Sequence, residues 1–315
     1  MLFERIGIFA GSSSVDLAKR MCEYLGTDLG ASQTIKFTEG NTFVKIQEKV
    51  RDKDVYIVQS IGISPNDDFM ELIFWIDAFK RSGASSVTAI IPFFSYAKAD
   101  KKDEPRVSIR ARVCADCLES AGVDRIISMD LHSPQIQGFF KKPVDHLYGL
   151  PIFCRYIMSK EIPDLVVVSP DAGFAKNARK FGEALKAPVA IGDKTRTGHD
   201  EQAEILEIIG DVSGKNALIV DDFTITCGTL TSLARELKAR GAKQIYACVS
   251  HALLNDKGLN TLEQSEIEEL IITDTVENKL VFSHPKVKVI SVAPLFAKAV
   301  EIIHNRESLS VLFDL

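Results

Sequence analysis

Short, continuous hydrophobic runs alternate along this chain with longer stretches in which hydrophobic residues recur every three or four positions. The continuous runs are rich in Val and Ile, which is typical of strands buried on both faces of a parallel sheet. The periodic stretches predict amphipathic helices that cover such a sheet. The pattern therefore predicts an α/β fold. The predicted strands span residues 6–10, 55–59, 87–92, 125–129, 165–169, 188–191, 217–220, 244–249, 269–272 and 287–291, and the predicted helices include residues 68–82, 108–121, 175–185 and 230–240.

The order of these elements repeats within the chain. Residues 6–12, which precede a helix, resemble residues 165–171, which also precede a helix. Residues 55–92 and 217–249 share the order strand, loop, helix and strand, and both pairs are offset by about 160 positions. An internal repeat of this kind predicts two related α/β domains with mainly parallel sheets.

The boundary between the two domains is expected near residues 147–151, where Tyr-Gly-Leu-Pro supplies the residues of a turn. One domain then spans residues 1–148 and the other spans residues 149–315. The last segment, from about Pro294, has the pattern of a helix. We expect this helix to return and pack on the first domain.

The composition is that of a globular protein without a strong charge bias. Of the 315 residues, 46% are hydrophobic, and 43 acidic side chains stand against 38 basic ones. The net charge of −5 argues against a nucleic-acid partner, because phosphate backbones are bound by basic surfaces. No segment approaches the roughly 20 apolar residues that span a bilayer, and the N-terminus does not resemble a signal peptide. We therefore expect a cytoplasmic protein with neither a membrane nor a nucleic acid as partner.

The six cysteines are scattered, at positions 22, 114, 117, 154, 227 and 248. Without a secretory signal, scattered cysteines are typical of reduced thiols in the cytoplasm. Cys114 and Cys117 have a spacing that occurs in zinc and redox sites, but they fall inside a predicted helix and no second pair accompanies them. We interpret them as structural.

A candidate phosphate-binding loop follows the predicted strand at residues 217–220. Two carboxylates, Asp221 and Asp222, come first, then a loop with small residues, then a helix. Ligands of open α/β sheets bind beyond the carboxyl ends of the strands, and threonine hydroxyls with backbone N–H groups at a helix start can hold a phosphate. The carboxylates can accept hydrogen bonds from sugar hydroxyls. The alternative is a capped turn without a ligand, but an acidic pair before Thr-x-Gly-Thr is uncommon, and we favour a binding site.

These residues carry a resemblance to a known family. The strand, the acidic pair and Thr226-Cys-Gly-Thr229 resemble the phosphoribosyl diphosphate motif of the type I phosphoribosyltransferase fold. Residues 130–140, Asp-Leu-His-Ser-Pro-Gln-Ile-Gln-Gly-Phe-Phe, and residues 169–173, Ser-Pro-Asp-Ala-Gly, are more specific. With them the chain resembles ribose-phosphate diphosphokinase over nearly its whole length. The resemblance implies two type I phosphoribosyltransferase-like domains and transfer of diphosphate from ATP to ribose 5-phosphate, giving 5-phosphoribosyl 1-diphosphate and AMP.

The resemblance also implies the residues that bind the sugar and assist the transfer. A polar segment, Gly192–Glu201, matches a lid whose Lys194 and Arg196 neutralise charge on the transferred diphosphate; without the resemblance we would interpret it as a solvated loop. The sugar loop departs from the family at Ile225, where Asp is usual. The implied ribose 5-phosphate site comprises Arg196, Asp221, Asp222, Ile225, Thr226, Cys227, Gly228 and Thr229.

The implied metal is Mg²⁺, bound by His132 and Asp171. Each of the two residues follows a predicted strand. From the residues alone we would favour a solvent-facing or hydrogen-bonded His132, because imidazole is an unusual ligand for so hard a cation. The resemblance reverses that preference, since both residues fall on the family's Mg²⁺-binding positions.

The implied ATP site has two parts, and the chain departs from the family in both. A hairpin that a neighbouring subunit often supplies contacts adenine, and a second loop binds the triphosphate. Lys98 and Ala99 stand where the family usually has Arg and Gln, which removes a bidentate donor and an amide, and Asn41 replaces a Glu. The residues in question are Phe37, Glu39, Asn41, Lys98, Ala99, Asp100 and Asp103.

The resemblance implies a homo-oligomer in which dimers assemble into a hexamer. Two other functions remain open: a non-catalytic regulatory homologue that associates with an active enzyme, and a phosphoribosyltransferase. Regulatory homologues tend to lose catalytic or metal-binding residues, whereas Lys194, Arg196, His132, Asp171 and Asp221 are all present. The matching N-terminal half with its ATP hairpin argues against a phosphoribosyltransferase.

Overall fold

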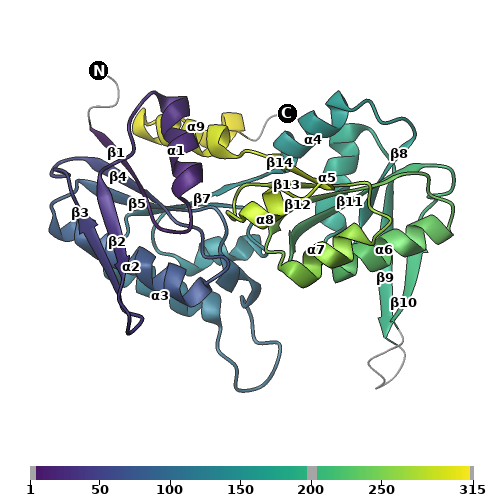
Figure 1. The fold of residues 1–315 in the computed structure, drawn as a ribbon, viewed down its shortest axis with the longest axis horizontal. Coiled ribbons are helices and arrows are strands. Elements are labelled where there is room, and N and C mark those ends of the chain that lie inside the picture. The colour runs from purple at the N-terminus through teal and green to yellow at the C-terminus, as the bar shows by residue number, and fades with distance from the viewer. Residues whose placement is uncertain (1–4, 197–203, 313–315) are drawn as a thin grey trace. The chain divides into compact units, whose positions relative to one another are not determined.

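The fold is that of a computed structural model, which describes residues 5–196 and 204–312 (Figure 1). The chain divides into two compact units. Unit 1 comprises Met1–Tyr148, Asp274–Glu277 and Ser291–Asp314. Unit 2 comprises Gly149–Thr273 and Asn278–Ile290. Within the described part of the chain, no helix is long and apolar enough to cross a membrane.

Unit 1 is built on a five-stranded parallel sheet with the order β1-β4-β5-β6-β7. Helices α2 and α3 bury Trp75, Phe79 and Leu118 against sheet residues such as Val55 and Ile57. Helix α9 packs against α1, so the final helix belongs to this unit. The elements are β1 (Ile6–Ala10), α1 (Val15–Leu25), β4 (Asp54–Val58), α2 (Pro65–Arg81), β5 (Ser86–Ile91), η1 (Ser95–Lys98), α3 (Arg110–Ala121), β6 (Arg125–Met129), η2 (Pro134–Phe139), β7 (Val144–Leu147), α9 (Ala293–His304) and η3 (Leu309–Leu312), with a separate antiparallel pair, β2 (Ser32–Lys36) and β3 (Thr42–Ile46).

Unit 2 is built on a seven-stranded sheet with the order β10-β9-β8-β11-β12-β13-β14. Its strands are parallel except that β10 runs antiparallel to β9 at one edge. Successive strand residues point to opposite faces, so Val166 packs with helices α6 and α7 and Val167 with α4 and α5. The elements are α4 (Leu150–Ser159), β8 (Leu165–Ser169), α5 (Ala175–Leu185), β9 (Val189–Arg196), β10 (Glu204–Ile209), β11 (Asn216–Thr224), α6 (Gly228–Ala239), β12 (Ile245–Ala252), α7 (Asp256–Glu263), β13 (Glu269–Thr273), α8 (Lys279–Phe282) and β14 (Val287–Ile290).

The predicted α/β class, with mainly parallel sheets flanked by helices, is confirmed. Strands β2, β3, β7 and β10 were not predicted, and the strand predicted at residues 244–249 continues as β12 to Ala252. Two further strand boundaries were wrong. The strand predicted at residues 188–191 continues as β9 to Arg196, because it pairs with β10, which the hydrophobic pattern did not indicate. The strand predicted at residues 217–220 continues as β11 through Thr224, because it stays in register with β12 as far as Ala252. In both cases backbone pairing extends a strand into polar sequence that side-chain pattern alone assigns to a loop.

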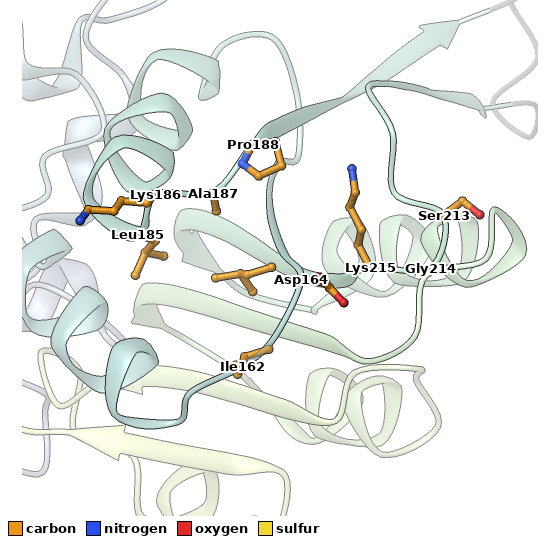
Figure 2. Close-up of a pocket in the computed structure, with 10 residues that line it drawn as sticks. Ile162, Asp164, Leu185, Lys186, Ala187, Pro188, Ser213, Gly214 and Lys215 are labelled. Atoms are coloured by element: carbon orange, nitrogen blue, oxygen red, sulfur yellow. The ribbon is translucent and has the colours of Figure 1, made fainter.

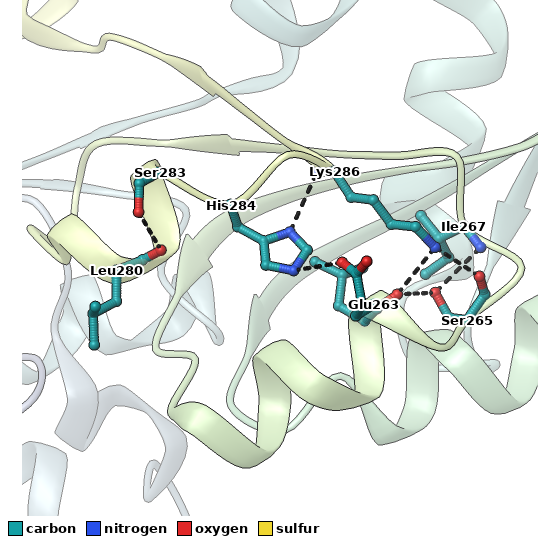
Figure 3. A network of polar contacts seen from close by, with 8 residues as sticks. Glu263, Ser265, Ile267, Leu280, Ser283, His284 and Lys286 are labelled. Carbon is teal, nitrogen blue, oxygen red and sulfur yellow. Dashed lines mark hydrogen bonds and ion pairs between the residues drawn. The ribbon is translucent and has the colours of Figure 1, made fainter.

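A polar network closes the C-terminal end of α7 (Figure 3). The ammonium of Lys286, at the start of β14, donates to the carbonyls of Leu262 and Ser265 at 3.3 and 2.8 Å. His284 accepts from the Lys286 backbone N–H at Nδ1, 3.2 Å away, and its Nε2 lies 3.0 Å from a Glu263 carboxylate oxygen. The Leu262 carbonyl also accepts the backbone N–H and the hydroxyl of Ser265, at 3.1 and 2.7 Å, so Lys286 adds a charged donor at and just beyond the helix end.

Replacing Lys286 with Met should therefore destabilise unit 2. We expect Lys286→Met to lower the free energy of unfolding by about 1–2 kcal/mol, because two part-buried carbonyls lose a charged donor. Urea denaturation followed by circular dichroism measures the change. Lys257→Met, on the exposed face of the same helix, is the matched control and should change the free energy by less than about 0.5 kcal/mol. Equal effects of the two substitutions would contradict the role of Lys286.

Candidate functional site

The candidate phosphate loop connects β11 to α6 in three residues, Ile225, Thr226 and Cys227. The hydroxyl of Thr224, the last strand residue, accepts the N–H of Cys227 at 3.2 Å. Cys227 adopts a left-handed conformation with φ of 56° and is only 1% exposed, so its side chain is part of the core beneath the loop. The turn is thus fixed from within, while Thr226 and Thr229 stay exposed above it.

The start of α6 is suited to an anion. The first N–H groups of a helix have no intrahelical acceptor, and here the residue before the helix, Cys227, makes no side-chain cap. The Thr226 hydroxyl lies 3.4 Å from the N–H of Gly228 and belongs to the same small surface. Parallel strands β8, β11 and β12 all end at this edge of the sheet. The arrangement is that of a phosphate site at the N-terminus of a helix.

The acidic pair lies inside β11, and the prediction that it follows the strand is wrong. Asp221 pairs with Val249 of β12 and Phe223 with His251, so the ladder continues on both sides of Asp222. The Asp221 carboxylate accepts the N–H of Asp222 at 2.9 Å, and the Asp222 carboxylate accepts the N–H of Phe223 at 2.8 Å. Asp222 is only 8% exposed. Strand pairing therefore holds both carboxyl groups in fixed positions beside the loop.

Negative charge accumulates around Asp221. The pKa of the Asp221 carboxyl is raised from 3.8 to about 8. Burial is the largest cause, and the charges of Asp222 and Asp171 contribute to the same rise. Like charges in a desolvated place disfavour ionisation unless a proton, a cation or a set of hydroxyl donors compensates them. The protein therefore provides, at one edge of unit 2, a place that favours a cation or a polyhydroxyl ligand.

Asp171 follows β8, the neighbour of β11. Its carboxylate accepts the N–H of Phe174 at 2.9 Å, and its carbonyl accepts the Ser169 hydroxyl at 2.7 Å. The side chain is exposed, so carboxylate oxygen lone pairs remain available to a ligand. No group of three His, Cys, Asp or Glu side chains converges as a complete metal site within the described residues. Mg²⁺ commonly takes only one or two protein carboxylates and completes its shell with water and phosphate, so this geometry fits it.

The other residues predicted for the site are distributed over both units. His132 is exposed, on the loop between β6 and η2 in unit 1, whereas Asp171 belongs to unit 2. Lys194 and Arg196 lie in β9, where their backbones pair with Leu206 and Glu204 and their side chains are outside the described structure. The segment predicted as a lid from Gly192 is therefore a strand as far as Arg196, and residues 197–203 lie outside the described residues.

The predicted ATP residues lie in unit 1. Phe37, Glu39 and Asn41 form the exposed turn between β2 and β3, where the N–H of Phe37 donates to the carbonyl of Asn41 at 2.8 Å. The Phe37 ring is 44% exposed. In the second loop Lys98 lies over the Phe93 ring at 5.8 Å, and Ala99 is 8% exposed. Asp100 is partly buried and Asp103 exposed.

The serine loop after β1 in unit 1, Gly11–Ser14, which the internal repeat matches to the loop after β8, does not keep an open anion site. The backbone N–H of Ser12 donates to the Glu71 carboxylate at 3.0 Å, and that of Ser13 donates to the Gln59 side chain at 3.1 Å. Glu71 is 3% exposed and also accepts from the Trp75 indole at 3.2 Å. A carboxylate of the protein itself occupies the place where an external anion would bind. This loop is therefore closed by side chains of the protein itself.

A cavity of about 610 Å³ lies at the opposite edge of the unit 2 sheet, at the amino ends of β8, β9 and β11 (Figure 2). Its lining is mixed: Leu165, Leu185 and Pro188 are among the apolar residues, and Asp164, Lys186 and Lys215 are among the polar ones. The ammonium of Lys215 on its wall is paired with Asp211 at 2.9 Å. Because ligands of such sheets bind at the carboxyl ends, this cavity is separate from the candidate site.

Sequence reasoning missed Gly258, which supports the phosphate loop from α7. A Cβ atom at this position would lie 2.9 Å from the carbonyl oxygen of Ile225 and 3.3 Å from the Cα of Thr226. Both neighbours are backbone atoms, so a side chain would displace the loop. The N–H of Gly258 is held at 3.0 Å by Asn255, which caps the helix. The sequence Asn-Asp-Lys-Gly indicates a turn. It does not indicate a contact with the phosphate loop.

Comparisons with known proteins agree across the whole chain. Residues 6–122 match the N-terminal domain of ribose phosphate pyrophosphokinase, and residues 195–314 match the phosphoribosyl synthetase-associated domain. Ribose-phosphate pyrophosphokinases from Caldanaerobacter subterraneus subsp. tengcongensis and Synechocystis sp. are 46% and 43% identical, covering 97% and 98% of this chain and 97% and 93% of their own lengths. The crystal structure of phosphoribosylpyrophosphate synthetase from Mycobacterium smegmatis is similar with a TM-score of 0.90 and 36% identity, over 96% of this chain and 100% of that one.

Removing the carboxyl group of Asp221 should stabilise the ligand-free protein at neutral and alkaline pH. The pKa of Asp221 is about 8 in the folded protein against an ordinary 3.8, so its contribution to stability is greatest below about pH 4 and is lost as the pH rises towards 8. Asp221→Asn should therefore raise the melting temperature at pH 8 and leave it nearly unchanged at pH 4.

Thermal unfolding of the wild type and of Asp221→Asn between pH 4 and pH 8 checks this pH dependence. Asp211→Asn is the control of opposite sign, because Lys215 lowers the pKa of the Asp211 carboxyl, so its contribution is present above the ordinary pKa and lost as the pH falls. A melting temperature of Asp221→Asn at or below that of the wild type at pH 8 would contradict the raised pKa of the Asp221 carboxyl.

Proposed function

The chain belongs to the ribose-phosphate pyrophosphokinase family, and from this premise we propose how its own residues carry out the reaction. It is an enzyme that transfers diphosphate from ATP to ribose 5-phosphate and forms 5-phosphoribosyl 1-diphosphate and AMP. One observation carries this function above the others. The likeness to a phosphoribosylpyrophosphate synthetase extends over 96% of the chain, so it includes both the sugar loop and the N-terminal unit that a phosphoribosyltransferase does not require.

We propose that the 5-phosphate of the sugar binds at the start of α6. The open N–H groups of the helix and the exposed Thr226 and Thr229 hydroxyls supply donors, and Cys227 fixes the turn beneath them. The ribose hydroxyls then donate to Asp221 and Asp222, and these hydrogen bonds stabilise the ionised form of Asp221 that burial disfavours. Ile225 is 42% exposed but has no polar atom in its side chain, so the two carboxylates of β11 hold the sugar without a third.

The metal requirement follows from the charges of the substrates and of the site. We propose Mg²⁺ as the cation, with His132 and Asp171 as the protein ligands. Three points support this: both side chains are exposed at strand ends, Asp171 keeps free carboxylate lone pairs, and the negative charge around Asp221 favours a cation. Bound there, Mg²⁺ would neutralise charge on the polyphosphate that is transferred.

Transfer of diphosphate places new negative charge between donor and acceptor, and the protein must supply cations that stabilise it. We propose Lys194 and Arg196, two residues apart in β9, for this role, and Arg196 also for the sugar site. The anomeric hydroxyl attacks the β-phosphorus of ATP directly, and no phospho-enzyme is required. β9 lies between β10 and β8, but its pairing with β8 ends at Ile191, so Lys194 and Arg196 pair only with β10.

ATP is proposed to bind to residues of unit 1. The exposed ring of Phe37 offers a stacking surface for adenine, with Glu39 and Asn41 beside it, and Lys98, Asp100 and Asp103 bind the triphosphate and its metal. Buried Ala99 contributes shape rather than a hydrogen bond. A hairpin that projects an aromatic ring into solvent supports the further proposal that a second copy completes the site, as dimers within a hexamer in the cytoplasm.

The activity is tested by mixing the protein with ATP, ribose 5-phosphate and Mg²⁺ and measuring AMP and 5-phosphoribosyl 1-diphosphate. We expect Lys194→Ala to lower kcat by about 10²–10³-fold, as the loss of one charge-stabilising donor does. Lys186→Ala, at an exposed lysine after α5, should leave kcat unchanged. Absence of turnover in the wild type would instead favour a non-catalytic homologue, and full activity of Lys194→Ala would reject the role of that residue.

Support of the sugar loop by Gly258 predicts a selective kinetic effect. Gly258→Val should raise the KM for ribose 5-phosphate by roughly 10-fold or more, because displacing the loop moves its donors from the phosphate, while the KM for ATP changes little. Lys257→Val places the same β-branched residue on the exposed side of α7 and controls for the loss of helix propensity. Equal changes in both variants, or equal changes in both KM values, would contradict this support.

A further inference from the structure

The loop that carries His132 begins with a sharp change of backbone direction. Strand β6 ends at Met129, and Asp130 then takes a left-handed conformation with φ of 40°. The N–H of Asp130 donates to the carbonyl of Leu147 at the end of the neighbouring strand β7, at 3.0 Å. A non-glycine residue in this conformation needs surrounding contacts to keep it there. The position of the loop therefore depends on what β7 provides.

The next backbone group is held by a side chain rather than by the sheet. The N–H of Leu131 donates to Nε2 of His146, in β7, at 2.9 Å. Leu131 is 7% and His146 6% exposed, so water cannot replace this acceptor. Because Nε2 accepts, the neutral imidazole carries its proton on Nδ1. His146 also lies against the Tyr148 ring, with 4.4 Å between ring centroids, which limits its rotation.

The other end of the loop is anchored as well. The N–H of Ile136 donates to the carbonyl of Ser133 at 3.1 Å, and the Ile136 side chain is completely buried at the start of η2. His132 thus stands between two fixed points, while its own side chain is exposed. Of these fixed points, only the one at Leu131 depends on a polar side chain from another element.

We propose that His146 is a positioning residue for His132: its Nε2 fixes the Leu131 N–H and thereby the place from which the His132 ring reaches the metal. The proposal rests on His132 being a metal ligand, as given above. A group that orients a metal ligand commonly changes metal affinity by 10- to 100-fold when it is lost. His146 acts here through the backbone N–H of Leu131, the residue before His132. Its Nε2 supplies a hydrogen-bond acceptor at a fixed point.

Three substitutions in the full-length enzyme test this. His146→Leu removes the acceptor and should weaken the binding of Mn²⁺, measured from the EPR signal of free Mn²⁺, by roughly 10-fold or more and raise the Mg²⁺ concentration for half-maximal turnover equally. His146→Gln keeps an acceptor near the same point and should stay within about 3-fold of the wild type. Ser128→Ala changes the buried residue that faces His146 in register, and its hydroxyl has no partner among the described residues, so it should change neither quantity.

The outcomes separate the positioning role from the ligand role. If His132→Ala leaves Mn²⁺ affinity unchanged, the proposed metal ligand is wrong and the role of His146 fails with it. If His132→Ala weakens binding but His146→Leu does not, or if His146→Gln loses as much as His146→Leu, the positioning role alone is overturned. Should His146→Leu not fold, amide hydrogen exchange in the wild type decides: the Leu131 N–H must be protected like the amides of β6, and unprotected exchange would reject the proposal.

Discussion

The parallel pairing of β11 with β8 and β12 is the constraint on which the candidate site depends. Because β11 continues four residues past Val220, it carries Asp221 and Asp222 within the ladder and delivers the chain to α6 after only three more residues. Strand pairing thus fixes the positions of both carboxylates and of the helix start. In an unpaired loop, only contacts of the loop's own side chains would fix these positions. The same edge receives Asp171 from β8. One ladder of backbone hydrogen bonds therefore sets the relative positions of all these groups.

The cost of this arrangement is electrostatic. Desolvation and neighbouring carboxylates raise the pKa of Asp221 to about 8, so the ligand-free enzyme holds a group that it cannot ionise easily near neutral pH. In the proposed complex, ribose hydroxyls and a divalent cation would relieve that condition, so the free energy that ionising Asp221 costs in the empty site would be recovered on binding. A site that is stable when occupied and strained when empty is a common result of selection for function over stability.

A loop that follows a parallel strand can stay open for binding or be closed by the protein's own side chains. In unit 2 the residue before α6, Cys227, makes no side-chain cap to the helix. In unit 1 the serine loop after β1, which the internal repeat matches to the loop after β8, is closed by Glu71 and Gln59, which accept the N–H groups of Ser12 and Ser13. The internal carboxylate satisfies the same donors that a phosphate would satisfy, and burial makes its removal costly. Only the loop with open donors can serve a substrate.

The sequence by itself determined the fold class and the family. Continuous Val and Ile runs predicted nearly all strands of the two parallel sheets, since burial on both faces leaves a strong hydrophobic pattern, and Asp221 to Thr229 with the stretches around His132 and Asp171 identified the chemistry. It did not indicate β10, the length of β9, or the place of Asp221 and Asp222 inside a strand, because polar residues in a strand are decided by backbone pairing and not by side-chain pattern. Nor did it indicate Glu71, Gly258 or His146. Each acts on a loop from a different element, at a distance in sequence that only tertiary packing closes. Each contacts backbone atoms of that loop, which only the folded chain brings to it.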